Sequence, residues 1–271
     1  MLTGLSGKIE RTALMATKQA LRGIRRCSPE LHVFIAGVQR SGTNMVMDVL
    51  ERSLDTDVYH ETDTRAFDNY QMRDVAVIHS LAHASKARYF IIKALCELEQ
   101  IPSLMDGFTP AKTIWIVRDY RHAVASALRS FKNFAKQVKR IASNTDSGDW
   151  RSRGMSESTR QLVGSTHHDN MNDASAAALI WYFRNLLFFE RGLDRDPRVR
   201  LVRYEALVTE PVKQFREIFD FLELSYSTWT TRKIFASSAV GGDAVDIEQS
   251  VCDLCERLTE RFELIHEQRG S

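Results

Sequence analysis

Short apolar segments alternate with amphipathic segments along most of the chain. The apolar segments are rich in β-branched residues and predict strands over residues 31–38, 88–93, 112–119 and 199–207. Apolar positions with helical spacing predict helices, among them residues 44–54, 174–193 and 247–267. Strands that alternate with helices are typical of a parallel sheet, because the crossover helices cover its faces. The pattern therefore predicts an α/β fold with a central, mostly parallel sheet flanked by helices.

Two segments depart from this alternation. Residues 7–26 carry six basic side chains and one acidic side chain among apolar positions at near-helical spacing, which predicts a basic amphipathic helix. Such a helix either packs on the body of the protein or makes a peripheral contact with an anionic membrane surface. Residues 142–173 are rich in Ser, Thr, Asp, Asn and Gly, and predict a long loop or insertion outside the core. We expect a helical extension over residues 1–30 and one domain over residues 31–271.

Composition narrows the class of protein. The 271 residues are 44% hydrophobic, which is enough for one large domain or two small ones. Lys and Arg number 37 against 35 Asp and Glu, so a general nucleic-acid binder is disfavoured and any anion site must be local. The apolar run at residues 31–38 is far shorter than the roughly 20 residues of a membrane span. The four cysteines are too sparse for a disulfide scaffold, and these features favour a cytoplasmic protein.

Residues 37–44, GVQRSGTN, follow a predicted strand and open a predicted helix. Gly42 can adopt a backbone conformation that other residues resist, and the amides of residues 40–44 would then point to one spot. Amides arranged in this way at the positive end of a helix dipole form a phosphate site. The alternative is a glycine turn that merely joins strand to helix.

This segment resembles a Walker A loop only in its glycines. Gly37 and Gly42 have the GxxxxGK[ST] spacing, but Thr43 stands in place of the lysine and Asn44 in place of the Ser or Thr. The cation that reaches the β and γ phosphates and the hydroxyl that holds magnesium are therefore missing, which disfavours an ordinary ATP or GTP hydrolase. The cation of this loop is Arg40, inside the loop itself.

A second candidate phosphate element lies at residues 112–128. It consists of a strand that ends at Arg118 and a helix that carries Ser126. An arginine at the carboxyl end of a parallel strand faces the crevice in which such sheets bind ligands. Ser126 follows about two turns later, so that its hydroxyl and the guanidinium can converge on a further phosphate. The alternative is a local ion pair between Arg118 and Asp119.

Together the two elements resemble the sulfotransferases that use 3′-phosphoadenosine 5′-phosphosulfate (PAPS). The residues Arg40, Ser41, Gly42 and Thr43 resemble the 5′-phosphosulfate loop of that family, which reads roughly [RK]SGTT. Arg118 and Ser126 resemble its 3′-phosphate element. The later part of the family sequence is matched by Trp181, Asn185, residues 201–211 and residues 221–224. The resemblance covers most of residues 31–265.

The resemblance implies a P-loop-like fold, PAPS as donor, and transfer of a sulfuryl group to a hydroxyl or amine without a metal ion. The residues implied in donor binding are Arg40, Ser41, Gly42, Thr43, Asn44, Arg118 and Ser126. Arg40 is also implied in catalysis, because negative charge builds on the oxygen that departs with the 5′-phosphate.

The general base is where the sequence departs from part of the family. Cytosolic members have a Lys-x-His pattern, whereas this chain reads Lys93, Ala94 and Leu95. Tyrosylprotein sulfotransferases and several bacterial or carbohydrate members instead have a Glu shortly after the first helix. Glu61, within residues 59–65, resembles this Glu in its position. A carboxylate in a partly desolvated crevice suits a general base. The alternative is a solvated loop acid.

Several assignments stay open. Other candidate bases are His60, His79 and His83, and Lys93 either helps to bind the sulfonate or is a surface lysine. The aromatic side chains Phe67, Tyr70 and Trp150 either stack on an acceptor ring or fill a satellite core. We expect a hydroxylated acceptor of carbohydrate, lipid or small-molecule type. The competing functions are a P-loop phosphotransferase and a non-catalytic nucleotide-binding scaffold.

Overall fold

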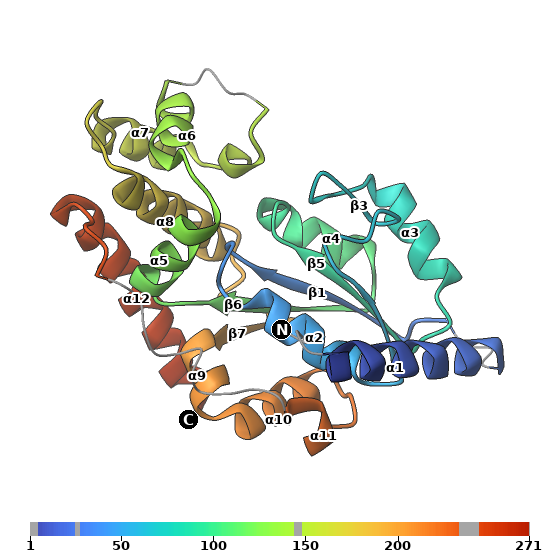
Figure 1. Ribbon diagram of the computed structural model, residues 1–271. Coiled ribbons are helices and arrows are strands. Elements are labelled where there is room, and N and C mark those ends of the chain that lie inside the picture. Colours follow the sequence, from blue (N-terminus) through green and yellow to red (C-terminus); the bar gives the residue numbers. More distant parts are fainter. Residues whose placement is uncertain (1–4, 25–27, 144–147, 233–243, 271) are drawn as a thin grey trace.

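A five-stranded parallel sheet forms the centre of the computed structural model (Figure 1), which describes residues 5–24, 28–143, 148–232 and 244–270. Its strands, in spatial order, are β2 (Thr56–Tyr59), β5 (Tyr89–Ala94), β1 (Leu31–Gly37), β6 (Ala111–Val117) and β7 (Val199–Arg203). Every pairing between neighbours is parallel. The predicted α/β fold with a central parallel sheet is confirmed. A two-stranded antiparallel hairpin, β3 (Phe67–Asp68) and β4 (Gln71–Met72), lies outside the sheet.

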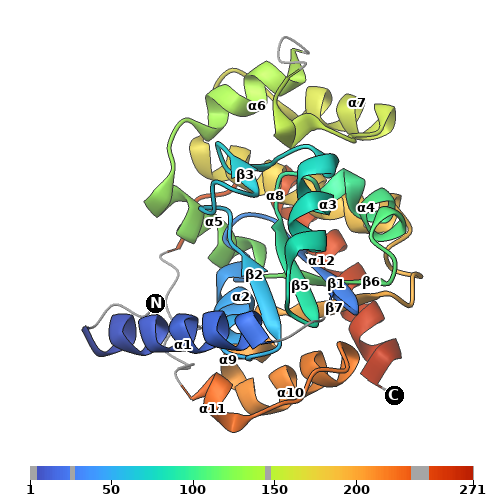
Figure 2. The same ribbon diagram turned by 90° about the vertical axis from the view of Figure 1, so that its right-hand side faces the viewer.

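Helices pack against both faces of this sheet (Figure 2). In the first half of the chain they are α1 (Leu5–Ile24), α2 (Thr43–Glu51), α3 (Val75–Ala84), α4 (Ile101–Gly107), α5 (Tyr120–Ser130) and α6 (Phe134–Ala142). In the second half they are α7 (Glu157–Thr166), α8 (Asp173–Glu190), α9 (Tyr204–Thr209), α10 (Pro211–Phe221), α11 (Thr228–Thr231) and α12 (Gln249–Gly270). Short 3₁₀ turns, η1 (Leu98–Gln100) and η2 (Trp150–Ser152), complete the described elements.

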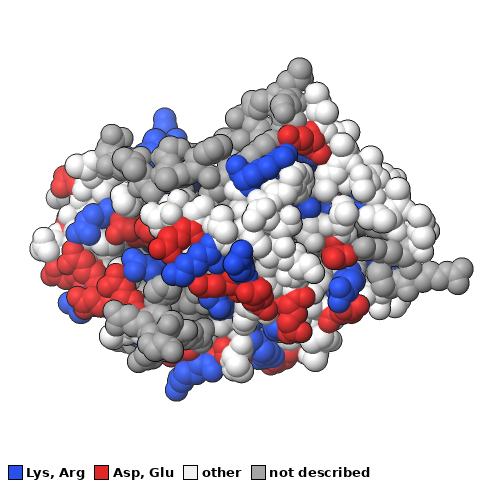
Figure 3. Space-filling view, turned by 90° about the horizontal axis from the view of Figure 1, so that it is seen from below, with Lys and Arg blue, Asp and Glu red and all other residues white. Residues whose placement is uncertain are grey.

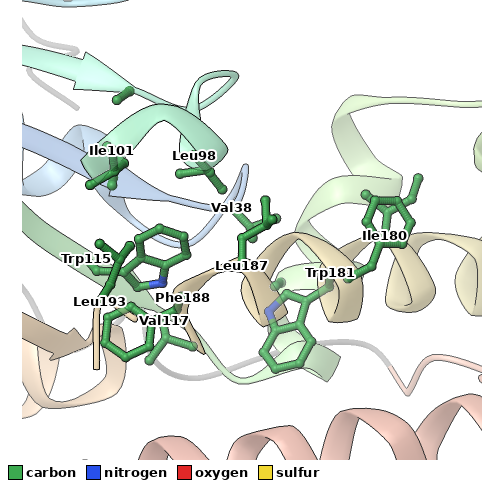
Figure 4. Close-up of a cluster of buried hydrophobic side chains, with 14 of the residues drawn as sticks. Val38, Leu98, Ile101, Trp115, Val117, Ile180, Trp181, Leu187, Phe188 and Leu193 are labelled. Carbon is green, nitrogen blue, oxygen red and sulfur yellow. The ribbon is translucent and has the colours of Figure 1, made fainter. Parts of the chain in front are cut away.

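The strand β1 shows why the sheet is covered on both sides. Val33 and Ile35 pack into one hydrophobic cluster, with α2, α9 and α10, whereas Phe34 and Ala36 pack into the other. Successive side chains of a strand point to opposite faces, so a strand with apolar side chains at successive positions needs two cores. The larger cluster lies between the sheet and α8, where the rings of Trp115 and Phe188 are 5.3 Å apart (Figure 4).

The apolar run at residues 199–207 was predicted as one strand, but it contains two elements. The strand β7 ends at Arg203 and helix α9 begins at Tyr204. The physical reason is a change of period, because α9 buries Tyr204, Leu207 and Val208 at helical spacing. This places Tyr204 at the carboxyl end of the sheet.

The described part of residues 142–173 contains η2 and α7, so the loop alternative is wrong for it. The expectation that this segment lies outside the core is also wrong at two positions. Val163 and Met171 are buried in the larger hydrophobic cluster. Residues 144–147 lie outside the described residues.

Helix caps explain the polar composition of this segment. Asp149 accepts a hydrogen bond from the Arg151 amide at the start of η2, and Ser156 accepts one from the Thr159 amide at the start of α7. Asn172 caps α8 in the same way. Short polar side chains favour both loops and N-caps, so composition alone does not separate the two.

The predicted N-terminal helix is present as α1, and it packs on the body of the protein. Lys18 is buried, and Arg11 forms an ion pair with Glu51 at the end of α2. The side chains of Lys8, Arg22, Arg25 and Arg26 lie outside the described residues. None of the helices in the described ranges combines the length and apolar character that a bilayer crossing needs. Contact of this helix with a membrane surface stays a prediction.

Charges of both signs are interspersed on the face of the molecule seen from below (Figure 3). This distribution agrees with the nearly balanced composition, since 37 basic residues face 35 acidic ones in the sequence. The described residues of this face therefore form no broad field of one sign that would attract a polyanion.

The packing of α7 generates a stability prediction. Val163→Ala removes two buried methyl groups, so we expect the free energy of unfolding to fall by roughly 1.5–3 kcal/mol. Urea denaturation measures this change as a lower midpoint with an unchanged slope. The control is Gln161→Ala on the exposed face of the same helix, with an expected change within about 0.5 kcal/mol. Equal midpoints for both variants would mean that Val163 is not packed in the hydrophobic core.

Candidate active site

The loop at residues 37–44 joins the carboxyl end of β1 to the first turn of α2, and its glycines are required by close packing. Gly42 has a φ of 99° and precedes α2, as the sequence predicted. A Cβ atom at Gly42 would lie 2.2 Å from Cδ2 of Tyr204, and one at Gly37 would lie 2.4 Å from the carbonyl oxygen of Ile116. No real Cβ contact is that short, so both positions admit only glycine without movement.

Arg40 links the two candidate phosphate elements. Its Nε donates a hydrogen bond to Oγ of Ser126 (2.9 Å), and its carbonyl oxygen accepts one from Nη1 of Arg118 (3.2 Å). The backbone of Arg40 is left-handed, with a φ of 71°, a conformation that costs a non-glycine residue on the order of 1 kcal/mol. Because β1 and β6 are neighbouring parallel strands, the loop after one lies beside Arg118 at the end of the other.

Arg118 is half-buried against the ring of Tyr204, with its guanidinium carbon 4.3 Å from the ring centroid. Burial lowers the pKa of Arg118, although Tyr204 and Glu205 oppose this effect. An arginine nevertheless stays charged at neutral pH. Its carbonyl oxygen accepts a hydrogen bond from Nε1 of Trp181 (3.1 Å), which fixes the end of β6 against α8.

Asp119 does not serve as a neutralising partner for the neighbouring arginine. Its Oδ1 accepts a hydrogen bond from the amide of His122 (3.1 Å) and caps α5, and its own amide donates to Oε1 of Glu205 (3.0 Å). Within the described ranges, Nε of Arg118 and Oγ of Ser41 are buried without a hydrogen-bond partner. Two unsatisfied buried donors, one within the loop and one beside it, fit a site for an anion with several oxygen atoms.

A second cluster of polar side chains lies beside the loop, at the end of β5. Lys93 is buried, and its Nζ is 2.6 Å from Oε2 of Glu61. The same ammonium donates a hydrogen bond to Oδ1 of Asn44, the second residue of α2. Burial lowers the pKa of Lys93, whereas the carboxylate of Glu61 raises it. The alternatives of a surface lysine and a freely solvated loop acid are therefore wrong.

The histidines named as other candidate bases have different surroundings. The ring of His79 stacks on Phe108 with centroids 3.9 Å apart, and Nε2 of His60 lies 3.6 Å from Oε1 of Glu51. His83 is an exposed residue in the last turn of α3. Glu61 is thus the candidate base that the structure brings into contact with the loop cluster, through Lys93.

The three aromatic candidates for acceptor stacking differ in exposure. Phe67 is buried in the larger hydrophobic cluster, so it belongs to the main core and neither stacks on an acceptor nor fills a satellite core. Trp150 packs against the guanidinium groups of Arg151 and Arg184, at 4.5 and 5.2 Å from its centroid. Tyr70 is 66% exposed at the turn of the β3–β4 hairpin.

Sequence reasoning did not identify Tyr204 as part of this site. The signal for it was its place directly after a strand of the sheet, but the strand was predicted to continue to residue 207. It also did not predict the contacts that Lys93 makes with Glu61 and Asn44, which join segments separated by 32 and 49 positions. In the described part of the chain, no group of three or more His, Cys, Asp and Glu side chains is placed to hold a metal ion.

Comparison with known proteins gives one family. The family model of the sulfotransferase domain matches residues 30–240 of this chain. This range includes the loop and every candidate residue described above. Among curated proteins, the comparison found no match.

Several solved sulfotransferases are similar to this chain. One is the sulfotransferase from Alicyclobacillus acidocaldarius, with 17% identity, a TM-score of 0.48, and coverage of 88% of this chain and 93% of that one. Another is the sulfotransferase domain of the Synechococcus PCC 7002 olefin synthase, with 15% identity, a TM-score of 0.49, and coverage of 86% and 95%. A third is mouse sulfotransferase SULT7A1 in complex with PAP, with 17% identity, a TM-score of 0.44, and coverage of 83% and 68%.

The packing of Gly42 against Tyr204 generates a prediction for ligand binding. Gly42→Ala adds a Cβ atom where the ring lies and strains a left-handed backbone, so we expect at least a tenfold loss of affinity for adenosine 3′,5′-bisphosphate. Isothermal titration calorimetry measures this loss. Gly164→Ala is the matched control, since a Cβ atom there meets nothing within 4 Å and binding should not change. Wild-type affinity in Gly42→Ala would contradict the role of this turn.

Proposed function

The chain belongs to the sulfotransferase family, and we propose that it transfers a sulfuryl group from PAPS to a hydroxyl, or an amine, of a carbohydrate, lipid or small-molecule acceptor. The observation that carries this proposal is the contact of Arg40 with both Ser126 and Arg118. It brings an amide-rich loop and a second cationic element into one site. A donor with phosphate groups at both its 5′ and 3′ positions requires two such elements at once.

The roles of the donor-binding residues follow from their places in the structure. Amides of the loop from Ser41 to Asn44 would hold the 5′-phosphate at the positive end of α2. Arg118 and Ser126 would hold the 3′-phosphate, which distinguishes this donor from AMP or ATP. Tyr204 supports this arrangement, because its ring packs against both Gly42 and Arg118.

Transfer forms one bond to sulfur and breaks another. The acceptor oxygen forms the new S–O bond while the S–O bond to the 5′-phosphate breaks, and adenosine 3′,5′-bisphosphate leaves. Negative charge grows on the bridging oxygen, so a guanidinium at Arg40 stabilises the transition state more than the ground state. Glu61 would accept the proton of the acceptor hydroxyl. Its contact with Lys93 holds this carboxylate beside the loop.

The two competing functions make different demands. A phosphotransferase needs a magnesium-bound nucleoside triphosphate, but Thr43 stands at the lysine position of a Walker A loop and Asn44 at the position of its magnesium-binding hydroxyl. A non-catalytic scaffold has no need of a buried lysine that holds a carboxylate beside the loop. We also expect a cytoplasmic enzyme without a nucleic-acid partner, and these two points stay predictions.

Donor selectivity tests the assignment of the two phosphate elements. We expect Arg118→Ala to weaken binding of adenosine 3′,5′-bisphosphate by about 10- to 100-fold, the effect of one charge-assisted hydrogen-bonding group, and binding of AMP by less than about threefold. The control is Arg121→Ala on α5, which removes an exposed partner of Glu256 and should leave both affinities unchanged. The affinity for ATP is measured by the same calorimetric titrations, once with magnesium and once without it. Tighter binding of ATP with magnesium would favour the phosphotransferase.

Turnover tests the assignment of Glu61. A cell extract is incubated with the purified protein and PAPS, and mass spectrometry detects products heavier by one sulfuryl group. A phenol, a hexose and a long-chain alcohol are tested as acceptors in the same way. With the best acceptor, Glu61→Gln should lower kcat by about 10²- to 10⁴-fold, because proton transfer to a base is lost. The affinity for adenosine 3′,5′-bisphosphate should stay within about threefold.

Asp68→Asn, an exposed carboxylate of the β3–β4 hairpin, is the control and should leave kcat unchanged. If Arg40→Ala and Glu61→Gln both turn over like the wild type, catalysis does not depend on this site. A protein that binds the bisphosphate but transfers to no acceptor would support the scaffold function.

A further inference from the structure

The N-terminal helix α1 precedes residues 30–240, the part of the chain that the family model matches. Polar contacts nevertheless attach it to the matched domain, among them an ion pair between Glu10 and Arg232. Two of these contacts, made by Lys18 and Arg11, reach the same unit of structure, which consists of α2 and the strand β2 that follows it. Figure 2 shows α1 lying along this unit. The function proposed above leaves these contacts without a role.

The first contact is made by Lys18, whose side chain is 2% exposed. Its ammonium donates hydrogen bonds to the carbonyl oxygen of Thr56 (3.0 Å) and to Oγ1 of the same residue (3.1 Å). Oγ1 of Thr56 in turn donates to the carbonyl oxygen of Leu50 in α2 (2.8 Å). Burying an ammonium is costly unless its hydrogen bonds are made, so this contact fixes the helix at one register on β2.

The second contact is made by Arg11. Its Nε and Nη2 donate to the two carboxylate oxygens of Glu51 at 2.9 and 2.8 Å, the bidentate geometry that fixes both orientation and distance. Glu51 is the last residue of α2 and is nearly buried. Burial alone would raise the pKa of Glu51, but His60 and Arg11 outweigh it and lower the pKa to about 2.

The unit held in this way has a functional residue at each end. Helix α2 begins at Thr43, directly after Gly42 of the loop, and strand β2 ends at Tyr59, two residues before Glu61. We propose that Arg11 and Lys18 are positioning residues, through which α1 fixes the distance between the donor-binding loop and the carboxylate of Glu61. This inference rests on the proposed function, because it presumes that Glu61 takes part in turnover.

The position of β2 depends on these contacts because of its place in the sheet. Among the described strands it is an edge strand that pairs with β5 alone, and it is four residues long. A short edge strand has few hydrogen bonds to hold it in register, so side-chain contacts on its open side decide its position. A misplacement of about 1 Å at a reacting group can cost on the order of 10²-fold in rate.

The experiment uses the full chain with PAPS as donor, the best acceptor of the panel, and adenosine 3′,5′-bisphosphate as the binding probe. We expect Arg11→Ala and Lys18→Met each to lower kcat by about tenfold or more, with the affinity for the bisphosphate within about threefold of the wild type. Arg11→Lys keeps a cation at Glu51 and should restore kcat to within about threefold.

Both variants are chosen to fold. Arg11 is half-exposed, and Lys18→Met replaces the buried ammonium with an apolar side chain of similar length. Unchanged affinity for the bisphosphate confirms the folded state. The matched control is Arg88→Ala, which breaks an exposed bidentate pair with Glu30. Arg88 precedes β5 at its amino-terminal end, away from Lys93, so this variant should leave kcat unchanged.

A double-mutant cycle separates a positioning role from a merely structural one. If α1 acts through Glu61, Arg11→Ala lowers kcat in the wild type but has little further effect in Glu61→Gln. Full additivity, wild-type kcat in both variants, or a parallel loss of kcat and bisphosphate affinity would each overturn the proposal. If Glu61→Gln itself leaves kcat unchanged, the base assignment fails instead.

Discussion

The parallel pairing of β1 with β6 is the constraint on which the rest of the site depends. In this register Gly37 lies opposite Ile116, so the segments after the two strands leave the sheet side by side. One segment is the loop with Arg40, and the other is Arg118 followed by α5 with Ser126. The packing is so close that a Cβ atom at Gly37 would collide with the backbone of β6. The guanidinium groups can therefore share a site only because the sheet brings its carboxyl ends together.

Much of this arrangement was predictable from local patterns. The strands predicted at residues 31–38, 88–93 and 112–119 each contain a continuous apolar run in the middle, since both faces of the sheet are buried there, and this makes them easy to identify. The loop was predictable because Gly42 and Arg40 stand between a strand and a helix. Backbone requirements of this kind depend on a few neighbouring residues, which a sequence shows directly.

Other parts depended on tertiary contacts or on ambiguous composition. The short strand β2 and the β3–β4 hairpin carry too few residues to show a period. The caps of η2, α7 and α8 use the same short polar residues that loops use, so the composition of residues 142–173 did not reveal the helices in that segment. The ion pair between Lys93 and Glu61 joins residues whose neighbourhood only the folded chain defines.

The buried ammonium of Lys18 has a second consequence, for the solubility of the folded protein. The carbonyl oxygen of Asp55 points towards β5, where it accepts a hydrogen bond from the amide of Tyr89, so the carbonyl of Thr56 points outwards along the open edge of the sheet. An unoccupied edge invites a strand of another molecule to pair with it. Lys18 occupies this carbonyl, so this acceptor on the β2 edge is not available for pairing with another strand.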